Sequence, residues 1–347
     1  MSLAFIFPGQ GSQFVGMGRE LYQASPAAQQ VFDTAQDRLG FSVLHFTKEH
    51  FADTANVQQA LLVVEYACFR ALCELFPNFE PAALAGHSLG EISALLCAGA
   101  ICFEDALELV RQRGTIMQST KKKGGMLAVI DADRALIDRV CNEVTASDPI
   151  AYLGISAYNS EQQLVLSGDE QSIALAESKL KQLGCNAVRL SNPLAFHSPL
   201  MQEAADQFAA VVNAMEIKAP RYPVISNVSA EPFVDAQEIK RLIVEQIAAP
   251  VRWQQSMSRL LAMELPIIEL GPKNTLSRLV NKTNNTGNFI STDNPPAAKD
   301  DLLRLLSAQS QQADNLSGPG LKAYIERVLA STRNSLQAKK EAYSAVK

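Results

Sequence analysis

The feature that most constrains the fold is the pentapeptide Gly86-His87-Ser88-Leu89-Gly90, which separates a short apolar run at residues 82–85 from a helix-like stretch. A serine between a buried strand and a helix must sit on a sharp turn, where a Cβ at the glycine positions would clash. The helix that follows points its free N–H groups and the positive end of its dipole at this turn. The pattern therefore predicts an α/β domain with a nucleophilic serine, although these five residues alone also fit an ordinary glycine-rich turn.

The rest of the chain fits one large α/β domain with an insertion. Residues 3–7 are an apolar run stopped by Pro8-Gly9, and residues 58–75 are apolar nearly all round, as in a buried helix. Between residues 124 and 193 the expected order is strand, helix, strand, strand, helix, strand, which is the signature of a ferredoxin-like unit. We therefore expect an α/β-hydrolase-like catalytic subdomain of residues 1–123 and 194–290, a ferredoxin-like subdomain of residues 124–193, and a polar, partly helical C-terminal extension of residues 291–347.

The second half of the large subdomain should alternate in the same way. We expect helices at residues 203–215 and 236–248, and strands at residues 222–228 and 266–270. In the extension, apolar residues recur near helical spacing between Leu321 and Leu336, which predicts one amphipathic helix.

Composition excludes several classes of protein. No apolar stretch is long enough to span a membrane, and the N-terminus lacks the basic region of a signal peptide. Six cysteines lie without a close pair, which indicates a reduced, cytoplasmic protein with neither disulfides nor a metal site. The net charge of -5 argues against nucleic acid, whereas a local basic patch could still bind an acidic protein.

A nucleophilic serine needs a base, and the chain has only 4 histidines. His87 adjoins Ser88, but neighbouring side chains at a strand end point in opposite directions, so it can hardly reach the hydroxyl. His45 and His50 lie in a polar stretch and are expected at the surface. His197 remains as the candidate base, with a buried core histidine as the alternative. Because no Asp or Glu in a strand-end context offers a third member, the sequence predicts a dyad whose imidazole is held by a backbone group.

Nine segments together resemble one family, the malonyl-CoA:acyl-carrier-protein transacylases of fatty-acid synthesis and the acyltransferases of polyketide synthases. The resemblance extends from residue 3 to about 290. The segments follow in order as FPGQGSQ (7–13), NVQQAL (56–61), GHSLGE (86–91), RQRGTIMQ (111–118), GGMLAV (124–129), LAFHSPLM (194–201), PVISNVSA (223–230), QIAAPVRW (246–253) and ELGPKNTL (269–276).

The resemblance implies a role for each matching residue. Ser88 would be the nucleophile and His197 its base, with Arg113 pairing with the malonyl carboxylate. The remaining positions would form the oxyanion hole through their backbone N–H groups (Gln10 and Leu89), orient the histidine through a main-chain carbonyl (Gln246), line the cleft (Gln58 and Asn159), and favour malonyl over a substituted malonyl (Phe196).

The resemblance also implies substrates and partners. The acyl group would pass from a coenzyme A thioester to Ser88 and then to the phosphopantetheine thiol of an acyl carrier protein, with no cofactor of the enzyme's own. The dense positive charge at Lys121-Lys122-Lys123 could steer an acidic carrier protein, or could be a solvated turn. An editing acyl hydrolase of the same family and a non-catalytic carrier-docking module are the alternatives. Arg113 argues against the hydrolase, because an enzyme for neutral acyl chains has no use for a buried guanidinium, and the intact Ser88, His197 and Arg113 argue against the docking module.

Three positions depart from the family's usual residues. Gln59 stands where proline is usual, Ile92 where tyrosine is common, and Lys273 where glycine is common. The extension after residue 290 lies outside the resemblance, which favours a free-standing enzyme that serves a polyketide assembly line in trans.

Overall fold

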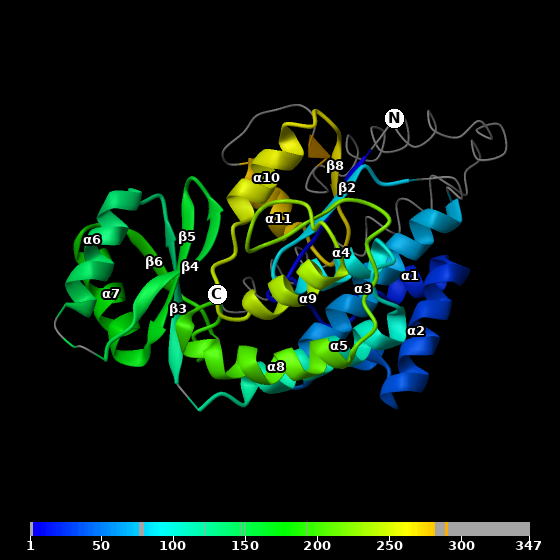
Figure 1. Ribbon diagram of the computed structural model, residues 1–347, viewed down its shortest axis with the longest axis horizontal. Helices are drawn as coiled ribbons and strands as arrows, with labels where there is room; N and C mark the ends of the chain where they lie inside the picture. Colours follow the sequence, from blue (N-terminus) through cyan, green and yellow to red (C-terminus); the bar gives the residue numbers. More distant parts are fainter. Residues whose placement is uncertain are drawn as a thin grey trace, which may run out of the picture.

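The computed structural model describes residues 3–75, 80–121, 123–146, 148, 150–191, 193–281 and 289–290. These residues form a large and a small unit, each built on its own sheet. In Figure 1 the small unit lies at the left, in green, beside the larger α/β unit. This arrangement confirms the predicted fold class.

The large sheet has five parallel strands in the order β7 (Val224–Ile225), β2 (Ala83–Gly86), β1 (Ala4–Phe7), β8 (Ile267–Glu269) and β9 (Phe289–Ile290). Strands of a parallel sheet are covered on both faces, so they are apolar throughout and do not alternate. Every residue of β1 and β2 is accordingly buried. The carboxyl ends of β1 and β2 lie side by side, with Phe7 opposite Gly86.

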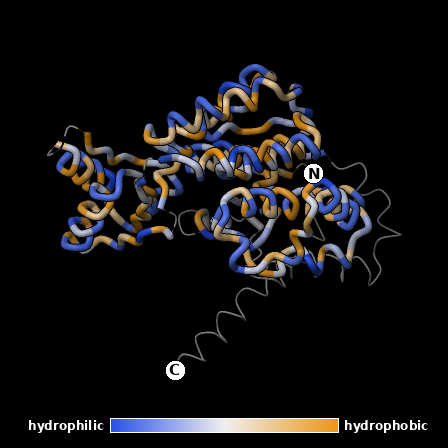
Figure 2. Tube along the Cα trace, turned by 90° about the horizontal axis from the view of Figure 1, so that it is seen from below, coloured by the Kyte–Doolittle hydropathy of each residue, from blue (hydrophilic) through white to orange (hydrophobic). Residues whose placement is uncertain are grey.

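Helices cover this sheet, and one of them begins at the serine. The helix α4 (Leu89–Cys97) packs on β1, β2 and β7, and α3 (Thr54–Leu75) packs against α4. The other helices of the large unit are α1 (Arg19–Ala24), α2 (Pro26–Leu39), α5 (Phe103–Gln118), α8 (Gln202–Ala214), α9 (Ala236–Glu245), α10 (Trp253–Leu261) and α11 (Thr275–Asn281). Short 3-10 helices span Val43–His45, His50–Ala52 and Pro199–Met201. Figure 2 shows hydrophilic and hydrophobic residues alternating around the turns of the outer helices, as expected where one face meets the core.

The small unit has the predicted split β-α-β arrangement. Its elements follow as β3 (Gly124–Ile130), α6 (Arg134–Thr145), β4 (Leu153–Ser160), β5 (Gln163–Asp169), α7 (Glu170–Gln182) and β6 (Asn186–Arg189), and the antiparallel sheet has the order β4-β5-β3-β6. A separate core that includes Leu127, Leu166, Ile173 and Leu180 fills the space between sheet and helices. The ferredoxin-like prediction is therefore confirmed.

The two units are joined through the edge strand β4. The backbone N–H of Val251, just before α10, donates to Ser156 O at 2.9 Å, and the N–H of Tyr158 donates to Val251 O at 2.9 Å. These two bonds extend the small sheet onto the large unit, and they place the end of β4 beside the turn that contains Ser88.

Two expectations for the second half differ from the structure or lie outside it. The strand expected at residues 222–228 is only Val224–Ile225, because the backbone N–H groups of Ser226 and Asn227 donate to Glu231 O and Glu91 Oε1 instead of a neighbouring strand. The helix expected between Leu321 and Leu336 lies outside the described residues. Of the helices in the described part of the chain, none is long and apolar enough to cross a membrane.

Candidate active site

Ser88 occupies a strained turn between β2 and α4. Its φ is 54° and its ψ is -103°, a conformation that L-residues seldom adopt. A Cβ on Gly86 would lie 1.9 Å from the carbonyl of Gly90, and a Cβ on Gly90 would lie 2.1 Å from Phe7 O. The strand and the helix therefore approach so closely that only glycine fits on either side of the serine.

The structure brings His197 to Ser88 from a distant part of the chain. Ser88 Oγ lies 2.8 Å from His197 Nε2, and His197 Nδ1 lies 2.8 Å from the backbone O of Gln246. A carbonyl oxygen can only accept, so Nδ1 holds the proton and Nε2 is left to accept from the serine hydroxyl. The backbone of Gln246 thus orients the imidazole, as a carboxylate does in a triad.

Burial sets the charge of this histidine. Its burial, followed by the positive charge of Arg113, lowers the pKa of His197 to about 3. The imidazole is therefore neutral at physiological pH, which is the form that a base requires.

Arg113, on α5, is buried directly beside the serine. Its Nη2 donates to Ser88 Oγ at 3.1 Å and to Gln246 Oε1 at 2.8 Å, while Nη1 donates to Gln58 Oε1 at 2.9 Å. Burial lowers the pKa of Arg113 to about 10, so the guanidinium keeps its charge at neutral pH. Its Nε has no hydrogen-bond partner among the described residues.

Two residues that the sequence did not single out complete the surroundings of Ser88. Asn227 Oδ1 accepts from the backbone N–H of Ser88 at 2.7 Å, and its Nδ2 donates to Gly86 O at 2.7 Å. Glu91, in the first turn of α4, accepts from Asn227 N at 2.5 Å and from Gln246 Nε2 at 2.6 Å. Both residues lie in segments that carry the family resemblance, GHSLGE and PVISNVSA, and Glu91 is also the only charged residue of the apolar helix LGEISALLC.

The remaining residues predicted for the site lie around Ser88 and His197; they are Asn159, Leu89, Gln10 and Phe196. Asn159 contacts His87, since the ring Nε2 lies 2.9 Å from Asn159 Oδ1, and in the described part of the chain its side chain forms no hydrogen bond to Ser88. Leu89 opens α4, so its N–H is one of those left free at a helix start. Gln10 is exposed in the loop after β1, and the preceding Gly9 packs against the backbone of His87. Phe196 is buried next to His197.

The remaining histidines and lysines do not enter the centre. His45 and His50 are exposed, and the ring of His50 stacks on Phe46. Lys121 and Lys123 are exposed between α5 and β3, and Lys122 lies outside the described residues.

The departures from the family pattern have structural consequences. Lys273 has a φ of 64°, the left-handed region that favours the glycine common there. Its Nζ donates to the carbonyls of Gly11 and Gln13 at 2.9 and 3.0 Å, so it holds the loop that contains Gln10. Gln59 and Ile92 are buried.

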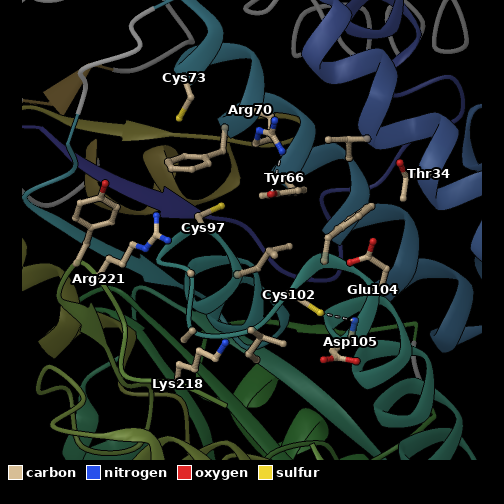
Figure 3. Close-up of a pocket in the computed structure, with 18 of the residues that line it drawn as sticks. Thr34, Tyr66, Arg70, Cys73, Cys97, Cys102, Glu104, Asp105, Lys218 and Arg221 are labelled. Atoms are coloured by element: carbon tan, nitrogen blue, oxygen red, sulfur yellow. Dashed lines mark hydrogen bonds between the residues drawn. The ribbon is translucent and has the colours of Figure 1, made fainter. Parts of the chain in front are cut away.

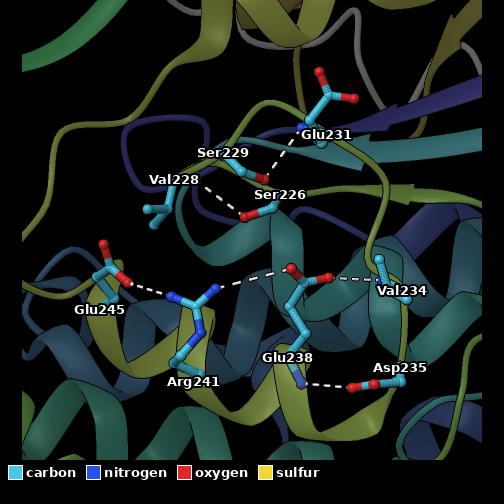
Figure 4. A network of polar contacts seen from close by, with 9 residues as sticks. All are labelled: Ser226, Val228, Ser229, Glu231, Val234, Asp235, Glu238, Arg241 and Glu245. Carbon is cyan, nitrogen blue, oxygen red and sulfur yellow. Dashed lines mark hydrogen bonds and ion pairs between the residues drawn. The ribbon is translucent and has the colours of Figure 1, made fainter.

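A surface network connects the segment after Asn227 to the helix before Gln246 (Figure 4). Arg241 forms ion pairs with Glu238 and Glu245 along α9, and Glu238 Oε2 also accepts from the backbone N–H of Val234 at 2.7 Å. Through Val234 and Asp235 the loop 226–235 is bonded to the first turn of α9, and the side-chain amides of Asn227 and Gln246, which meet behind Ser88, lie at the two ends of this connected segment.

A cavity of about 670 Å³ lies at the other end of α4 (Figure 3). Cys97 and Cys102 line it, and Arg70 and Arg221 reach it from α3 and from the segment after α8. It shares no residue with the centre around Ser88.

A parallel α/β sheet with a histidine-paired serine on such an elbow defines the class of α/β-hydrolase-like enzymes that form an acyl-enzyme. Within this class, the chain belongs to the family of the acyl transferase domain, whose model matches residues 4–311. The match runs past residue 290, where the catalytic subdomain was expected to end.

Curated relatives and solved structures agree with this membership. The malonyl CoA-acyl carrier protein transacylase of Bacillus subtilis (strain 168) is 38% identical over 303 residues, which cover 84% of this chain and 94% of the relative. The enzyme of the same name from Haemophilus influenzae is 33% identical over 288 residues, covering 80% and 91%. The crystal structure of FabD from Acinetobacter baumannii superimposes with a TM-score of 0.81 at 32% identity, covering 89% of this chain and 99% of that one. A type II polyketide synthase acyl-carrier protein in complex with its malonyl-transacylase matches with a TM-score of 0.78 at 33% identity, covering 83% and 94%.

Proposed function

We propose that this chain is an acyl-carrier-protein S-malonyltransferase, which moves a malonyl group from coenzyme A to the phosphopantetheine thiol of an acyl carrier protein in fatty-acid or polyketide synthesis. Family membership and the activity named for the relatives support it. The single observation that carries it is Arg113, a buried guanidinium whose Nη2 lies 3.1 Å from Ser88 Oγ. An acyl group with a free carboxylate is the substrate that such a site would select, because guanidinium and carboxylate form paired hydrogen bonds.

In the first half-reaction, Ser88 Oγ attacks the thioester carbonyl carbon while its proton passes to His197 Nε2. The C–S bond then breaks, and the coenzyme A sulfur takes the proton from the imidazolium. The free N–H of Leu89, at the start of α4, and that of Gln10 are the proposed donors to the carbonyl oxygen as it becomes negative.

In the second half-reaction, the phosphopantetheine thiol gives its proton to His197 and attacks the malonyl ester. The C–O bond breaks, and Ser88 Oγ recovers its proton from the imidazolium. Each step uses only groups of the chain and its two thiol substrates, so we propose that the enzyme needs no cofactor. We also expect a cytoplasmic enzyme, because six unpaired cysteines fit a reducing compartment.

Arg113 separates this function from editing hydrolysis. A hydrolase for neutral acyl chains would have to bury the guanidinium without a carboxylate partner, which is costly. Phe196, buried beside the base, would further favour plain malonyl, although one extra methyl changes binding by only about 1–3 kcal/mol.

Acyl-enzyme formation tests the proposal directly. After incubation with malonyl-CoA, intact-mass analysis should show one malonyl group on the wild type and none on Ser88→Ala. His197→Ala should load more slowly by about two orders of magnitude or more, the usual contribution of a general base. His45→Ala, at an exposed histidine, is the matched control and should load like the wild type.

A second arm compares acyl groups. The wild type should load malonyl far better than acetyl, and Arg113→Ala should reverse that order by removing the partner of the carboxylate. The malonyl-enzyme should persist in water and discharge when carrier protein is added. Preference for neutral acyl groups, or discharge at the same rate without carrier, would instead identify an editing hydrolase.

A further inference from the structure

Behind Ser88, one side-chain amide separates two buried charges. Arg113 Nη2 donates to Gln246 Oε1 at 2.8 Å, and Gln246 Nε2 donates to Glu91 Oε2 at 2.6 Å. The second oxygen of Glu91 accepts from Asn227 N at 2.5 Å. Glu91 is fully buried and Arg113 is nearly so, which makes this a dry chain that runs from guanidinium to amide to carboxylate.

Arg113 and Glu91 interact without touching. Among the described residues no carboxylate forms an ion pair with Arg113, whereas the charge of Glu91 opposes the fall in the pKa of Arg113 that burial causes. A buried guanidinium needs a compensating charge, but a carboxylate in direct contact would compete with an acidic substrate for the same N–H groups. An intervening amide meets both requirements.

The carboxylate also fixes which way the amide points. Burial raises the pKa of Glu91, but both of its oxygens accept from N–H groups, at 2.5 and 2.6 Å, which is the pattern of an ionised carboxylate. Such a carboxylate only accepts hydrogen bonds, so Glu91 requires the nitrogen of the Gln246 side chain and turns its oxygen toward Arg113. If that amide rotated by half a turn, its NH₂ group would face the guanidinium and push it out of position.

We propose that Glu91 is a positioning and specificity-determining residue, the remote counter-ion of Arg113 acting through the side chain of Gln246. It keeps Arg113 charged and oriented while leaving the guanidinium to the carboxylate of the incoming acyl group. This inference rests on the proposed malonyl transfer, since it explains how the site selects an acidic acyl group.

Glu91→Gln is the first test. The new amide can accept from only one of the two donors, Asn227 N–H and Gln246 Nε2, so the Gln246 side chain should rotate and displace Arg113. The ratio of malonyl to acetyl loading, measured by intact mass, should fall by about tenfold or more, as for a misdirected charge-assisted hydrogen bond. The KM for malonyl-CoA should rise, whereas the kcat with acetyl-CoA should change much less.

The exchange variant Glu91→Gln/Gln246→Glu separates specificity from folding. In it the amide at position 91 accepts from Asn227 N–H and donates to the carboxylate at position 246, so the donors of Asn227 and Arg113 are paired again and the bond from residue 246 to Ser88 O is lost. The melting temperature should therefore return toward that of the wild type. The malonyl preference should stay lost, because a carboxylate now contacts Arg113 directly.

A purely structural role would predict that both properties recover together in the exchange variant, and that result would overturn the proposal. If the exchange variant does not fold, Glu91→Gln decides alone. A selective loss of malonyl loading then supports the proposal, and equal losses for malonyl and acetyl contradict it.

Glu65→Gln is the matched control. Glu65 is another fully buried glutamate, on α3, but unlike Glu91 it accepts from no backbone or amide N–H among the described residues. Burial raises its pKa well above the usual range, so the change replaces one neutral group by another. Its malonyl-to-acetyl ratio should equal that of the wild type, and a fall as large as in Glu91→Gln would refute a specific role for Glu91. A wild type that does not load malonyl would refute the proposed function itself, a distinct outcome.

Discussion

Among the ionisable side chains close to Ser88, those of His197, Arg113 and Glu91 depart from their ordinary pKa values, and burial is the first cause in each. The pKa of His197 falls to about 3, that of Arg113 falls to about 10, and that of Glu91 rises above its ordinary value. Burial disfavours whichever form is charged, so bases lose protons more readily and acids less readily. At neutral pH this leaves a neutral imidazole next to a charged guanidinium.

The lowered pKa of His197 predicts an unusual pH dependence. A base with a pKa of about 3 stays deprotonated as pH falls from 8 to 5, so kcat/KM for malonyl transfer should show no histidine inflection near pH 6.5. Quenched-flow measurements of Ser88 acylation across this range would check it. A half-loss of acylation near pH 6.5, in a protein still folded by circular dichroism, would contradict the pKa.

The same shift predicts loss of stability in acid. The unfolded chain binds a proton at this histidine near pH 6.5, whereas the folded chain binds it only near pH 3. Protons therefore favour unfolding throughout this window, and the melting temperature should drop as pH falls from 6.5 toward 3. The drop in melting temperature should be shallower in His197→Gln, because the side chain at position 197 then no longer titrates. Both proteins are melted in the same buffers.

At the same scale, the sequence singled out the two residues proposed to react, but not the residues that hydrogen-bond around them. Ser88 was found from the glycines that its turn requires, and His197 by elimination among four histidines. Asn227 and Glu91 lie in two of the segments that resemble the family but were given no role, because an asparagine before a loop and a glutamate in a helix are ordinary unless their partners are known. Only the folded chain shows that both lie within hydrogen-bond distance of the groups behind Ser88.

Among the elements, the loop after β1 is the least supported part of the proposed oxyanion hole. It contains Gln10, which is exposed, and Lys273 ties it to the segment after β8 through two hydrogen bonds. Lys273 makes these bonds from a left-handed backbone conformation, with φ at 64°. The backbone of Lys273 is therefore strained, while its side chain holds the loop that contains Gln10.

Lys273→Gly should separate these two effects. Removing the tie should lower kcat for acylation severalfold with little change in KM, because a mobile oxyanion donor stabilises the transition state less. Lys273→Ala should lower kcat equally and should be less stable than Lys273→Gly, since only glycine relieves the positive φ. Acylation rates and melting temperatures of the two variants provide the measurement, and a kcat equal to that of the wild type in both would disprove the role of the loop tie.

In the molecule as a whole, the proposed catalytic groups lie in the large unit, and the small unit contacts it beside Ser88. Asn159, at the end of β4, contacts His87 beside the nucleophile, and the backbone bonds of Val251 hold β4 in place. The described fold ends with β9 at Ile290, while the family match extends to residue 311.

Truncation tests where the catalytic unit ends. A chain that stops after residue 295 retains all described elements, so we expect it to load malonyl from coenzyme A as the full chain does. A chain that stops after residue 311, the end of the family match, is the control. If the shorter protein is folded but unreactive and the longer one is active, the boundary expected at residue 290 is wrong.

The sequence by itself determined the order of strands and helices, the ferredoxin-like insertion and the elbow at Ser88, because each depends on residues close together in the chain. Apolar periodicity decides which segments are buried, and glycines at residues 86 and 90 are required by contacts within one strand–turn–helix. The tertiary structure alone decided what surrounds the nucleophile. Gln246 Nε2 reaches Ser88 O across 158 positions of the chain, and the distance between them depends on how the large sheet, α5 and α9 pack together. Packing sets such distances to within an ångström, whereas the local sequence pattern specifies only which elements can form.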